Sequence, residues 1–367
     1  MSILIFFIVL SILVVVHELG HYLVAKACGI KVEEFGLGIP PRIGGIRIGE
    51  TLYSINLLPF GGFVKVFGEE EAQLKGRQLT DGEKKRSFVH KPAWQQSAVL
   101  VAGVVCNFIL GWAIMSYLFT QGVPVTTDKV IVQETQPGSP AAKAGFQKDD
   151  IISQIMLKDG STIETPKTTQ AFISIVSKNK GKELVFVTTR KDGQTFSIEA
   201  TPRANPPEGQ GALGLIVSDQ IIKKYSPFEA PILGLKESVT MTLAVVQGIG
   251  KMVTDLLSFS GRQVDVVGPV GIYYITSSAA QNGFTALLQL VGLLSLNLAV
   301  VNILPIPALD GGRLAMVLYE KLARRKIKPA LLYRMNTVGF GLLIGLIILI
   351  TVRDFLQLDT LKSLLAK

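Results

Sequence analysis

Long apolar runs alternate with polar segments along this chain, and the runs predict membrane-spanning helices. Apolar residues dominate 3–27 and 94–120, and the second stretch contains no charged residue. Two more apolar stretches cover 284–304 and 338–352. Because a helix rises about 1.5 Å per residue, roughly 20 apolar residues cross a hydrocarbon layer of about 30 Å. The pattern therefore predicts about four transmembrane helices.

Two apolar segments allow a second interpretation. Residues 1–16 could be a cleaved signal peptide, but they lack a basic start and a small-residue cleavage site, and the apolar run continues past His21. Residues 228–260 contain a central uncharged run of only thirteen positions, 238–250. This favours a helix lying in the membrane interface and leaves a fifth span open.

Residues 126–219 differ from the rest of the chain, because polar alternation and Gly or Pro punctuation replace the apolar runs. Ser139 is a predicted helix N-cap, with Pro140 at the first helical position and Gly145 at the helix end. Strands are expected at 149–155 and 213–217, a longer helix near 168–178, and a hairpin that turns at Asp192-Gly193. The segment is therefore expected to be a folded, water-soluble α+β domain.

The order of elements in residues 126–219 resembles a circularly permuted bacterial PDZ domain. Such domains bind extended peptides by strand addition. A small spacer that binds nothing is the alternative, because a fold does not determine a function.

Composition and charge agree with a membrane protein. Hydrophobic residues make up 48% of the 367 positions, and the net charge is +9. Basic residues are numerous in 26–91, which has eleven, and in 313–334, which has seven. Both loops are therefore expected to be cytoplasmic and to lie near anionic lipid headgroups, without a nucleic-acid partner. The termini and residues 126–219 then lie outside, and Cys28 and Cys106 give no disulfide framework.

Three ionisable residues interrupt the first apolar run: His17, Glu18 and His21. Such groups inside a membrane segment are costly and usually functional. Positions i and i+4 share a helix face, so the two imidazoles can bind one Zn²⁺ while the glutamate reaches a water beside it. Two buried histidines without a metal are the alternative, but the whole chain has three histidines and two of them fall at this spacing.

A third metal ligand is expected from a distant part of the chain. Cys28 lies about 10 Å from His21 along the helix, which is too far. His90 belongs to a basic, surface-like stretch. Asp310 is the only acidic residue between Asp265 and Glu320, and it follows an apolar run that two prolines interrupt. It is the preferred candidate, with a role as helix N-cap as the alternative.

Taken together, the chain resembles a site-2 protease of the bacterial RseP type. The sequences "HELGH", "NILPIPALDGG" and "VGPVGI" and the PDZ-like insert occur in that family's order. The resemblance implies one zinc per chain, bound by His17, His21 and Asp310, with Glu18 as the catalytic acid and base. It also implies that Asn302 contacts the substrate backbone, although an interhelical hydrogen bond is an alternative for this residue.

The resemblance also gives a role to 52–68, which alternates and turns at Pro59, Phe60, Gly61 and Gly62. This segment resembles the family's membrane-associated β-hairpin, whose open edge could bind an unwound substrate. An ordinary hairpin resting on the membrane is the alternative. The sequence "AGVVCNF" departs from the "AGP" common in relatives, which puts the local helix geometry near 103–107 in doubt.

The expected architecture is a polytopic α-helical membrane protein with an inserted α+β PDZ-like domain and a membrane-associated β-hairpin. Its segments are 1–125, 126–219, 220–283 and 284–367. The expected function is zinc-dependent cleavage of single-pass membrane proteins, such as pre-cleaved anti-sigma factors or signal-peptide remnants, in a bacterial plasma membrane. We expect membrane lipids as partners and a monomer. A catalytically silent PDZ adaptor and a zinc transporter are the alternatives.

Overall fold

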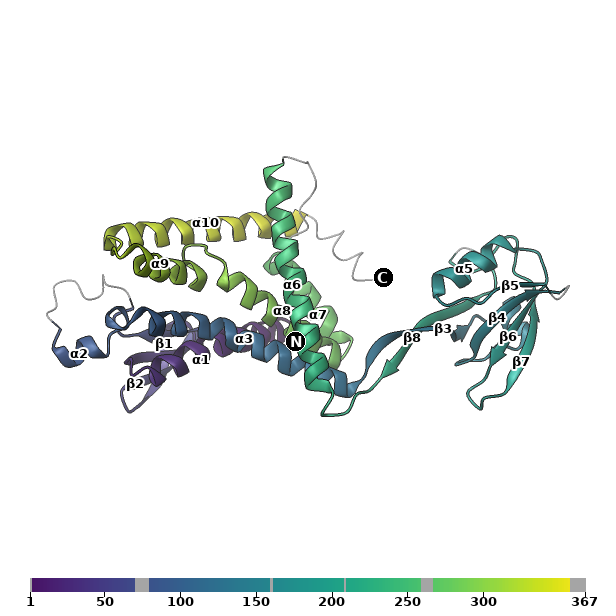
Figure 1. The fold of residues 1–367 in the computed structure, drawn as a ribbon, viewed down its shortest axis with the longest axis horizontal. Coiled ribbons are helices and arrows are strands. Elements are labelled where there is room, and N and C mark those ends of the chain that lie inside the picture. The colour runs from purple at the N-terminus through teal and green to yellow at the C-terminus, as the bar shows by residue number, and fades with distance from the viewer. Residues whose placement is uncertain (1, 70–78, 159–160, 208, 259–266, 357–367) are drawn as a thin grey trace. The chain divides into compact units, whose positions relative to one another are not determined.

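The chain divides into two compact units. One unit combines Met1–Thr120 with Ser226–Lys367, and the other is Gln121–Tyr225. The structure is a computed structural model, and it describes residues 2–69, 79–158, 161–207, 209–258 and 267–356 (Figure 1). The second unit contains the predicted insert 126–219 and a few residues on either side of it. Residues 259–266 and 357–367, which belong to two of the expected segments, lie outside the described residues.

The first unit is mainly helical. Its described helices are α1 (Ser2–Ala27), α2 (Asp81–Lys85), α3 (Ala93–Gln121), α6 (Ala230–Leu257), α7 (Pro269–Gln281), α8 (Phe284–Ile303), α9 (Asp310–Ala323) and α10 (Pro329–Leu356), with a 3-10 turn at Phe88–His90.

Five helices among the described residues are long and apolar enough to cross a membrane: α1, α3, α6, α8 and α10. Four of them match the apolar runs of the sequence. The fifth, α6, is a single 28-residue helix in the region where an interfacial helix was the favoured interpretation. This helix is long enough, apolar enough and poor enough in charged residues to be a candidate membrane span. The fifth span that the sequence left open therefore has a matching helix.

Small residues bring α1 and α3 into close contact. A Cβ atom on Gly20 would lie only 2.4 Å from the carbonyl oxygen of Ala102, so no larger residue fits at this position of α1. Gly103, the next residue of α3, is also close to this position, so the two helices are in direct contact here. Because helix backbones approach this closely only where side chains are small, the ligand-bearing turn of α1 is placed directly against α3.

Two long strands follow α1: β1 (Val32–Ile48) and β2 (Thr51–Val66). Gly36 of β1 has two partners in β2, Ser54 on one side and Phe63 on the other. The segment 34–37 of β1 therefore lies between the two halves of β2, 52–58 and 62–66, which do not pair with each other. The predicted hairpin within 52–68 was wrong, because β1 supplies the partner strand for both halves.

The tight turn between β1 and β2 is tied to the end of α1. Lys26 Nζ donates to Glu50 Oε1 at 2.8 Å, and Arg86 donates to the other carboxylate oxygen. The hydrogen bond from Lys26, supported by the one from Arg86, holds the pKa of Glu50 below its usual range. The sheet is thus held against the helix that carries the histidines.

The second unit is an α+β domain built on one sheet. The strands are β3 (Val123–Thr135), β4 (Ile151–Leu157), β5 (Thr162–Glu164), β6 (Leu184–Thr189), β7 (Thr195–Ala200) and β8 (Leu215–Lys223), in the order β7-β6-β4-β3-β8 with β5 on β4. The helices are α4 (Pro140–Ala144) and α5 (Thr169–Lys178).

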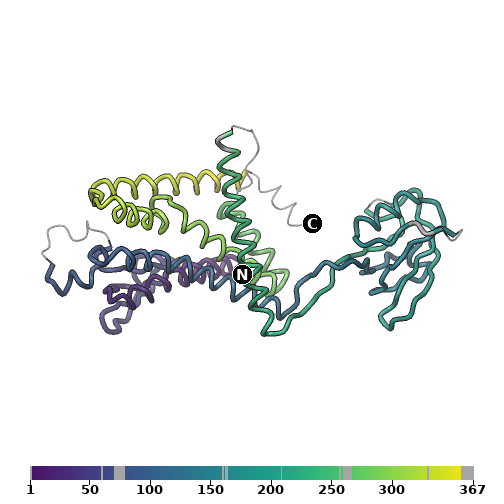
Figure 2. Tube along the Cα trace, in the orientation of Figure 1, coloured from purple at the N-terminus to yellow at the C-terminus, as the bar shows by residue number. Residues whose placement is uncertain are grey.

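Local signals in this unit predicted its caps and turns correctly. Ser139 caps α4 by accepting from the Ala142 amide, Pro140 is its first residue, and Gly145 ends it with a φ of 91°. β6 and β7 pair as the predicted hairpin around Asp192-Gly193. The core consists of apolar residues from these elements, including the fully buried Val130, Ile155, Leu184 and Phe186. The two ends of the unit pair in β3 and β8 (Figure 2).

A buried carboxylate joins α10 to the start of α7. Asp354 is 4% exposed, and its carboxylate accepts from the Gly271 amide at 2.9 Å and the Gly268 amide at 3.4 Å. A negative group at a helix N-terminus satisfies free amides and interacts favourably with the helix dipole. A Cβ atom on Gly268 would lie 2.7 Å from this carboxylate, and one on Gly271 would lie 2.5 Å from Val267, so neither position has room for a side chain.

We predict that Asp354→Ala lowers the free energy of unfolding by about 2 kcal/mol, because two buried amides lose a charged acceptor. Thermal unfolding of the purified protein in detergent measures this change. Asp128→Ala, which removes an exposed aspartate from β3, is the matched control. Equal midpoints for both variants would contradict a stabilising role for Asp354.

Candidate metal centre

The two histidines of the first apolar run meet on the buried side of α1. His17 and His21 are 6% and 7% exposed. One helical turn separates them, and their Nε2 atoms lie 3.1 Å apart. The i,i+4 spacing that predicted a shared face is therefore confirmed in the folded chain.

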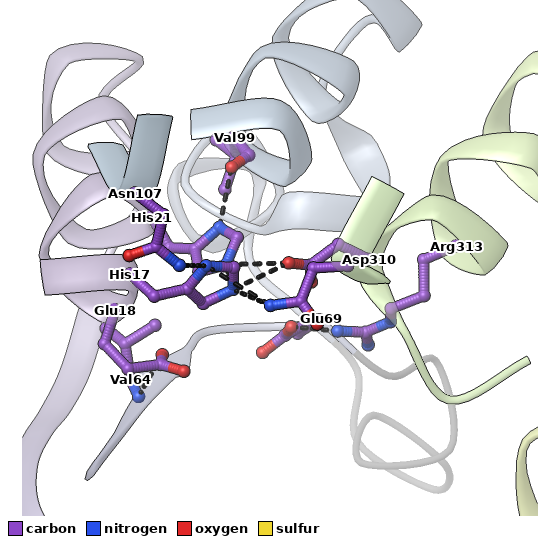
Figure 3. Close-up of polar contacts among 10 residues, drawn as sticks. His17, Glu18, His21, Val64, Glu69, Val99, Asn107, Asp310 and Arg313 are labelled. Carbon is purple, nitrogen blue, oxygen red and sulfur yellow. Dashed lines mark hydrogen bonds and ion pairs between the residues drawn. The ribbon is translucent and has the colours of Figure 1, made fainter. Parts of the chain in front are cut away.

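Asp310 joins the two histidines from the other end of the chain. Its Oδ2 atom lies 2.9 Å from His17 Nε2 and 3.2 Å from His21 Nε2 (Figure 3). Among the described residues, these three form the one group of His, Cys, Asp and Glu side chains whose ligand atoms lie within 4.8 Å of one another. Of the three candidates for a third ligand, Asp310, Cys28 and His90, Asp310 is the one that lies beside both histidines. His90 Nδ1 instead lies 3.2 Å from Ser87 Oγ.

A sharp reversal between α8 and α9 places Asp310. Ala308 has a φ of 76°, in the left-handed region that non-glycine residues rarely adopt. Gly311 then packs so closely that a Cβ atom would lie 2.1 Å from the Ile303 carbonyl oxygen. Asp310 is the first residue of α9, and Leu309 takes the N-cap position without a side-chain bond. The alternative role of Asp310 as N-cap is therefore not what the structure shows.

The donor set fits zinc. Two imidazoles and a carboxylate are common zinc ligands, and three protein ligands leave the open position typical of a catalytic site. Ligand atoms at about 2.0–2.1 Å from a tetrahedral zinc lie about 3.3 Å from each other. The three ligand separations of 2.9, 3.1 and 3.2 Å are close to this value.

Groups on α3 orient the histidines. His21 Nδ1 donates to the carbonyl oxygen of Val99 at 2.7 Å, and the side-chain amide of Asn107 lies 3.2 Å from His17 Nδ1. Neither contact was predicted from the sequence. A backbone carbonyl leaves no residue-type signal, and Asn107 stood out only within the unusual sequence "AGVVCNF". That sequence forms continuous helix, and the doubt about its geometry is removed.

Glu18 lies beside the ligand group without belonging to it. Its Oε2 atom accepts a hydrogen bond from the backbone amide of Val64 at 3.0 Å, so β2 holds this carboxylate in place. Glu69, just past β2, forms an ion pair with Arg313 of α9 (Figure 3). These contacts link β2 and the residues just after it to α1 and α9, the helices that carry the candidate ligands.

The predicted substrate-binding residues fall into two groups. Asn302, near the end of α8, places its amide nitrogen 3.3 Å from His17 Nε2. Gly61 and Gly62 lie in β2, and a Cβ atom on Gly62 would be 3.5 Å from Val15, two residues before His17. The side chains of Pro59 and Phe60 lie outside the described residues, although their backbone continues β2.

Comparison with known proteins agrees with this geometry. The family model described as peptidase family M50 matches residues 5–346, a range that includes His17, Glu18, His21 and Asp310. The chain belongs to peptidase family M50. It is similar to the zinc metalloprotease RasP of Oceanobacillus iheyensis, with 31% identity over 431 residues, covering 96% of this chain and 98% of that protein. The regulator of sigma-W protease RasP of Bacillus subtilis is 30% identical over 436 residues, with the same coverage of 96% and 98%.

As an M50 peptidase with helices of membrane-spanning length, the chain is a multi-pass membrane protein and a zinc metalloendopeptidase of the site-2 protease type. Zn²⁺ is its cofactor. The side chains of His17, His21 and Asp310 are the group in the described residues that suits this ion.

Gly103 of α3 offers a test of the metal centre. A Cβ atom there would lie 2.6 Å from both His17 Cε1 and His21 Nε2. We predict that Gly103→Ala displaces the imidazoles and weakens zinc binding at least about tenfold, as changes beside metal ligands do. Zinc content after dialysis, measured by elemental analysis, reports the loss.

Gly248→Ala in α6 is the matched control, because a Cβ atom at this position would meet no neighbouring atom within 4 Å. Alanine is more favourable than glycine inside a helix by up to about 1 kcal/mol. Neither substitution should therefore destabilise the helix that carries it through helix propensity. Full zinc content in the Gly103 variant would show that α3 does not confine the ligands.

Proposed function

We propose that this M50 peptidase cleaves the transmembrane segments of single-pass membrane proteins that another protease has already shortened, such as anti-sigma factors, or signal-peptide remnants. The observation that carries the proposal is a His-His-Asp centre whose histidines lie on α1, a helix of membrane-spanning length, with Glu18 on the same helix and Asp310 at the start of α9. The name of the Bacillus subtilis relative, regulator of sigma-W protease, supports a substrate in sigma-factor control.

His17, His21 and Asp310 are the residues that hold the metal in this proposal. A zinc ion held there would supply Lewis acidity that lowers the pKa of a bound water to near neutral. Glu18 is the residue that would accept a proton from the attacking water and pass it to the amine of the leaving segment. The Val64 amide bonds one oxygen of the Glu18 carboxylate and restrains its position, and proton transfer is assigned to the other oxygen.

Substrate must unwind before its carbonyl groups can be attacked, because a helix hides them in hydrogen bonds. Asn302 is proposed to hold the substrate backbone near the scissile bond. Residues 59–62, with Pro59, Phe60, Gly61 and Gly62, are proposed to receive the unwound segment beside β2. Their place in the strand that also carries Val64 supports this assignment.

The proposed orientation follows from charge. The basic segments 26–91 and 313–334 face the cytoplasm of a bacterial cell, near anionic lipids. The termini and the second unit then lie outside, with the metal centre toward the cytoplasmic side. This orientation requires four crossings, so α6 is proposed to lie in the membrane interface although its length and composition suit a span. The second unit is proposed to be a PDZ-like domain, on the basis of the order of its elements, and the enzyme to act as a monomer.

A catalytically silent adaptor is the alternative function. Such a protein would be expected to lack the acidic groups of the centre, yet Glu18 and Asp310 are both present and close to the histidines. The comparisons with metalloproteases favour the enzyme as well.

The role of Glu18 separates chemistry from metal binding. We predict that Glu18→Gln keeps the zinc but slows cleavage by about 10² to 10⁴-fold, the usual contribution of general acid and base catalysis. Purified enzyme is incubated with a panel of tagged single-span proteins in detergent, with and without chelator. His21→Ala, which removes a ligand, is the control that should lose both zinc and cleavage. Wild-type cleavage by the glutamine variant would refute the mechanism.

The second unit is predicted to select substrates by excluding bulky ectodomains. Its ends pair side by side, with Val125 opposite Ile221, so replacing 126–219 by a short flexible linker should leave the first unit intact. Exclusion predicts that the shortened enzyme, with normal zinc content, cleaves substrates that still carry large ectodomains. A capture role predicts instead slower cleavage of trimmed substrates at an unchanged position. An unaltered preference for trimmed substrates would reject both roles.

A further inference from the structure

Asn107 is a fully buried polar residue in the middle of an apolar helix. Its exposed fraction is 0%, and its side-chain Nδ2 lies 3.2 Å from His17 Nδ1. Its other side-chain atom, Oδ1, is buried and has no hydrogen-bond partner among the described residues. A buried amide is costly unless both of its polar atoms are used, so this side chain requires a role.

The metal chemistry of His17 decides which amide atom must face it. The Nε2 atom of His17 points at Asp310 and His21, so it is the ligand atom. A nitrogen that binds zinc carries no proton, and the ring proton therefore sits on Nδ1. A protonated Nδ1 needs an acceptor, and an NH₂ group cannot accept. The amide of Asn107 matches this state only when its Oδ1 faces the ring.

Asn302 does not replace Asn107 in this role. Its Nδ2 atom lies 3.4 Å from His17 Nδ1 and 3.3 Å from His17 Nε2. A group almost equally far from both ring nitrogens does not lie along the N–H direction of either one. Asn302 is thus left for substrate, and Asn107 is the side chain suited to Nδ1.

We propose that Asn107 is a positioning residue that accepts a hydrogen bond from His17 Nδ1 through its Oδ1 atom when zinc is bound. It fixes the tautomer and the ring orientation of the ligand, as Val99 does for His21. The Asn107 amide and His17 Nδ1 face each other in Figure 3. The amide carries both a donor and an acceptor, so a rotation about its last side-chain bond presents Oδ1 to the ring.

The test is the zinc affinity of purified variants, measured by competition with a chromophoric chelator. Asn107→Leu keeps the volume but removes the acceptor, and zinc should bind about 10 to 100-fold more weakly. Asn107→Asp keeps an acceptor at the same place. Its zinc affinity should be no more than about threefold weaker than that of the unaltered chain. The visible spectrum of the cobalt-loaded aspartate variant should also match that of the unaltered chain, because the ligand geometry is kept.

Ser295→Ala is the control for packing. Ser295 Oγ donates to the backbone carbonyl of Asn107 at 2.8 Å, so its loss disturbs the same turn of α3 and leaves the amide side chain in place. This variant should hold zinc normally. Unchanged affinity in the leucine variant, or equal losses in the leucine and aspartate variants, would overturn the proposal. If the leucine variant does not fold, the aspartate variant decides alone, since a large loss of affinity there would also refute an acceptor role.

Discussion

The imidazoles of His17 and His21 and the carboxylate of Asp310 lie together among apolar helices. The free-energy cost of burying each group must be offset by contacts with the other two or with a cation. Burying such groups separately would cost several kcal/mol each, because water no longer solvates them. Placing them within hydrogen-bond distance of one another removes much of that cost. The same arrangement presents three ligand atoms to one point, so the condition for burial and the condition for binding a metal are met by a single geometry.

Much of the helical unit follows from this condition. Gly20 and Gly103 let α3 approach α1 so closely that Val99 and Asn107 reach the histidine rings. The break after α8 lets α9 begin with Asp310 at the level of the histidines. Glu18 is then supported from a third side by Val64. Helix contacts, chain reversal and strand all converge on one small volume.

The parts that could be predicted from sequence are those with a local signal. The spacing of His17 and His21 is a property of one helix, and Asp310 stands out as a lone acid in an apolar region. The cap at Ser139 and the turn at Asp192-Gly193 depend on neighbouring residues in the same way. The pairing of β1 with both halves of β2, by contrast, is decided by contacts between distant segments. The bond from His21 to Val99 uses a carbonyl that every residue type carries, so residue identity could not reveal it.

The pairing of β3 with β8 has a consequence for the evolution of the chain. Since the second unit leaves and re-enters through two adjacent strands, with Val123 opposite Lys223, its connection occupies little more than the width of a hairpin. A module attached in this manner can be exchanged or duplicated by a single genetic insertion, because the distance between the two attachment points does not depend on what lies beyond them. The peptidase unit and its accessory module can therefore diversify at different rates, and a new accessory domain can be acquired without changes to the metal centre.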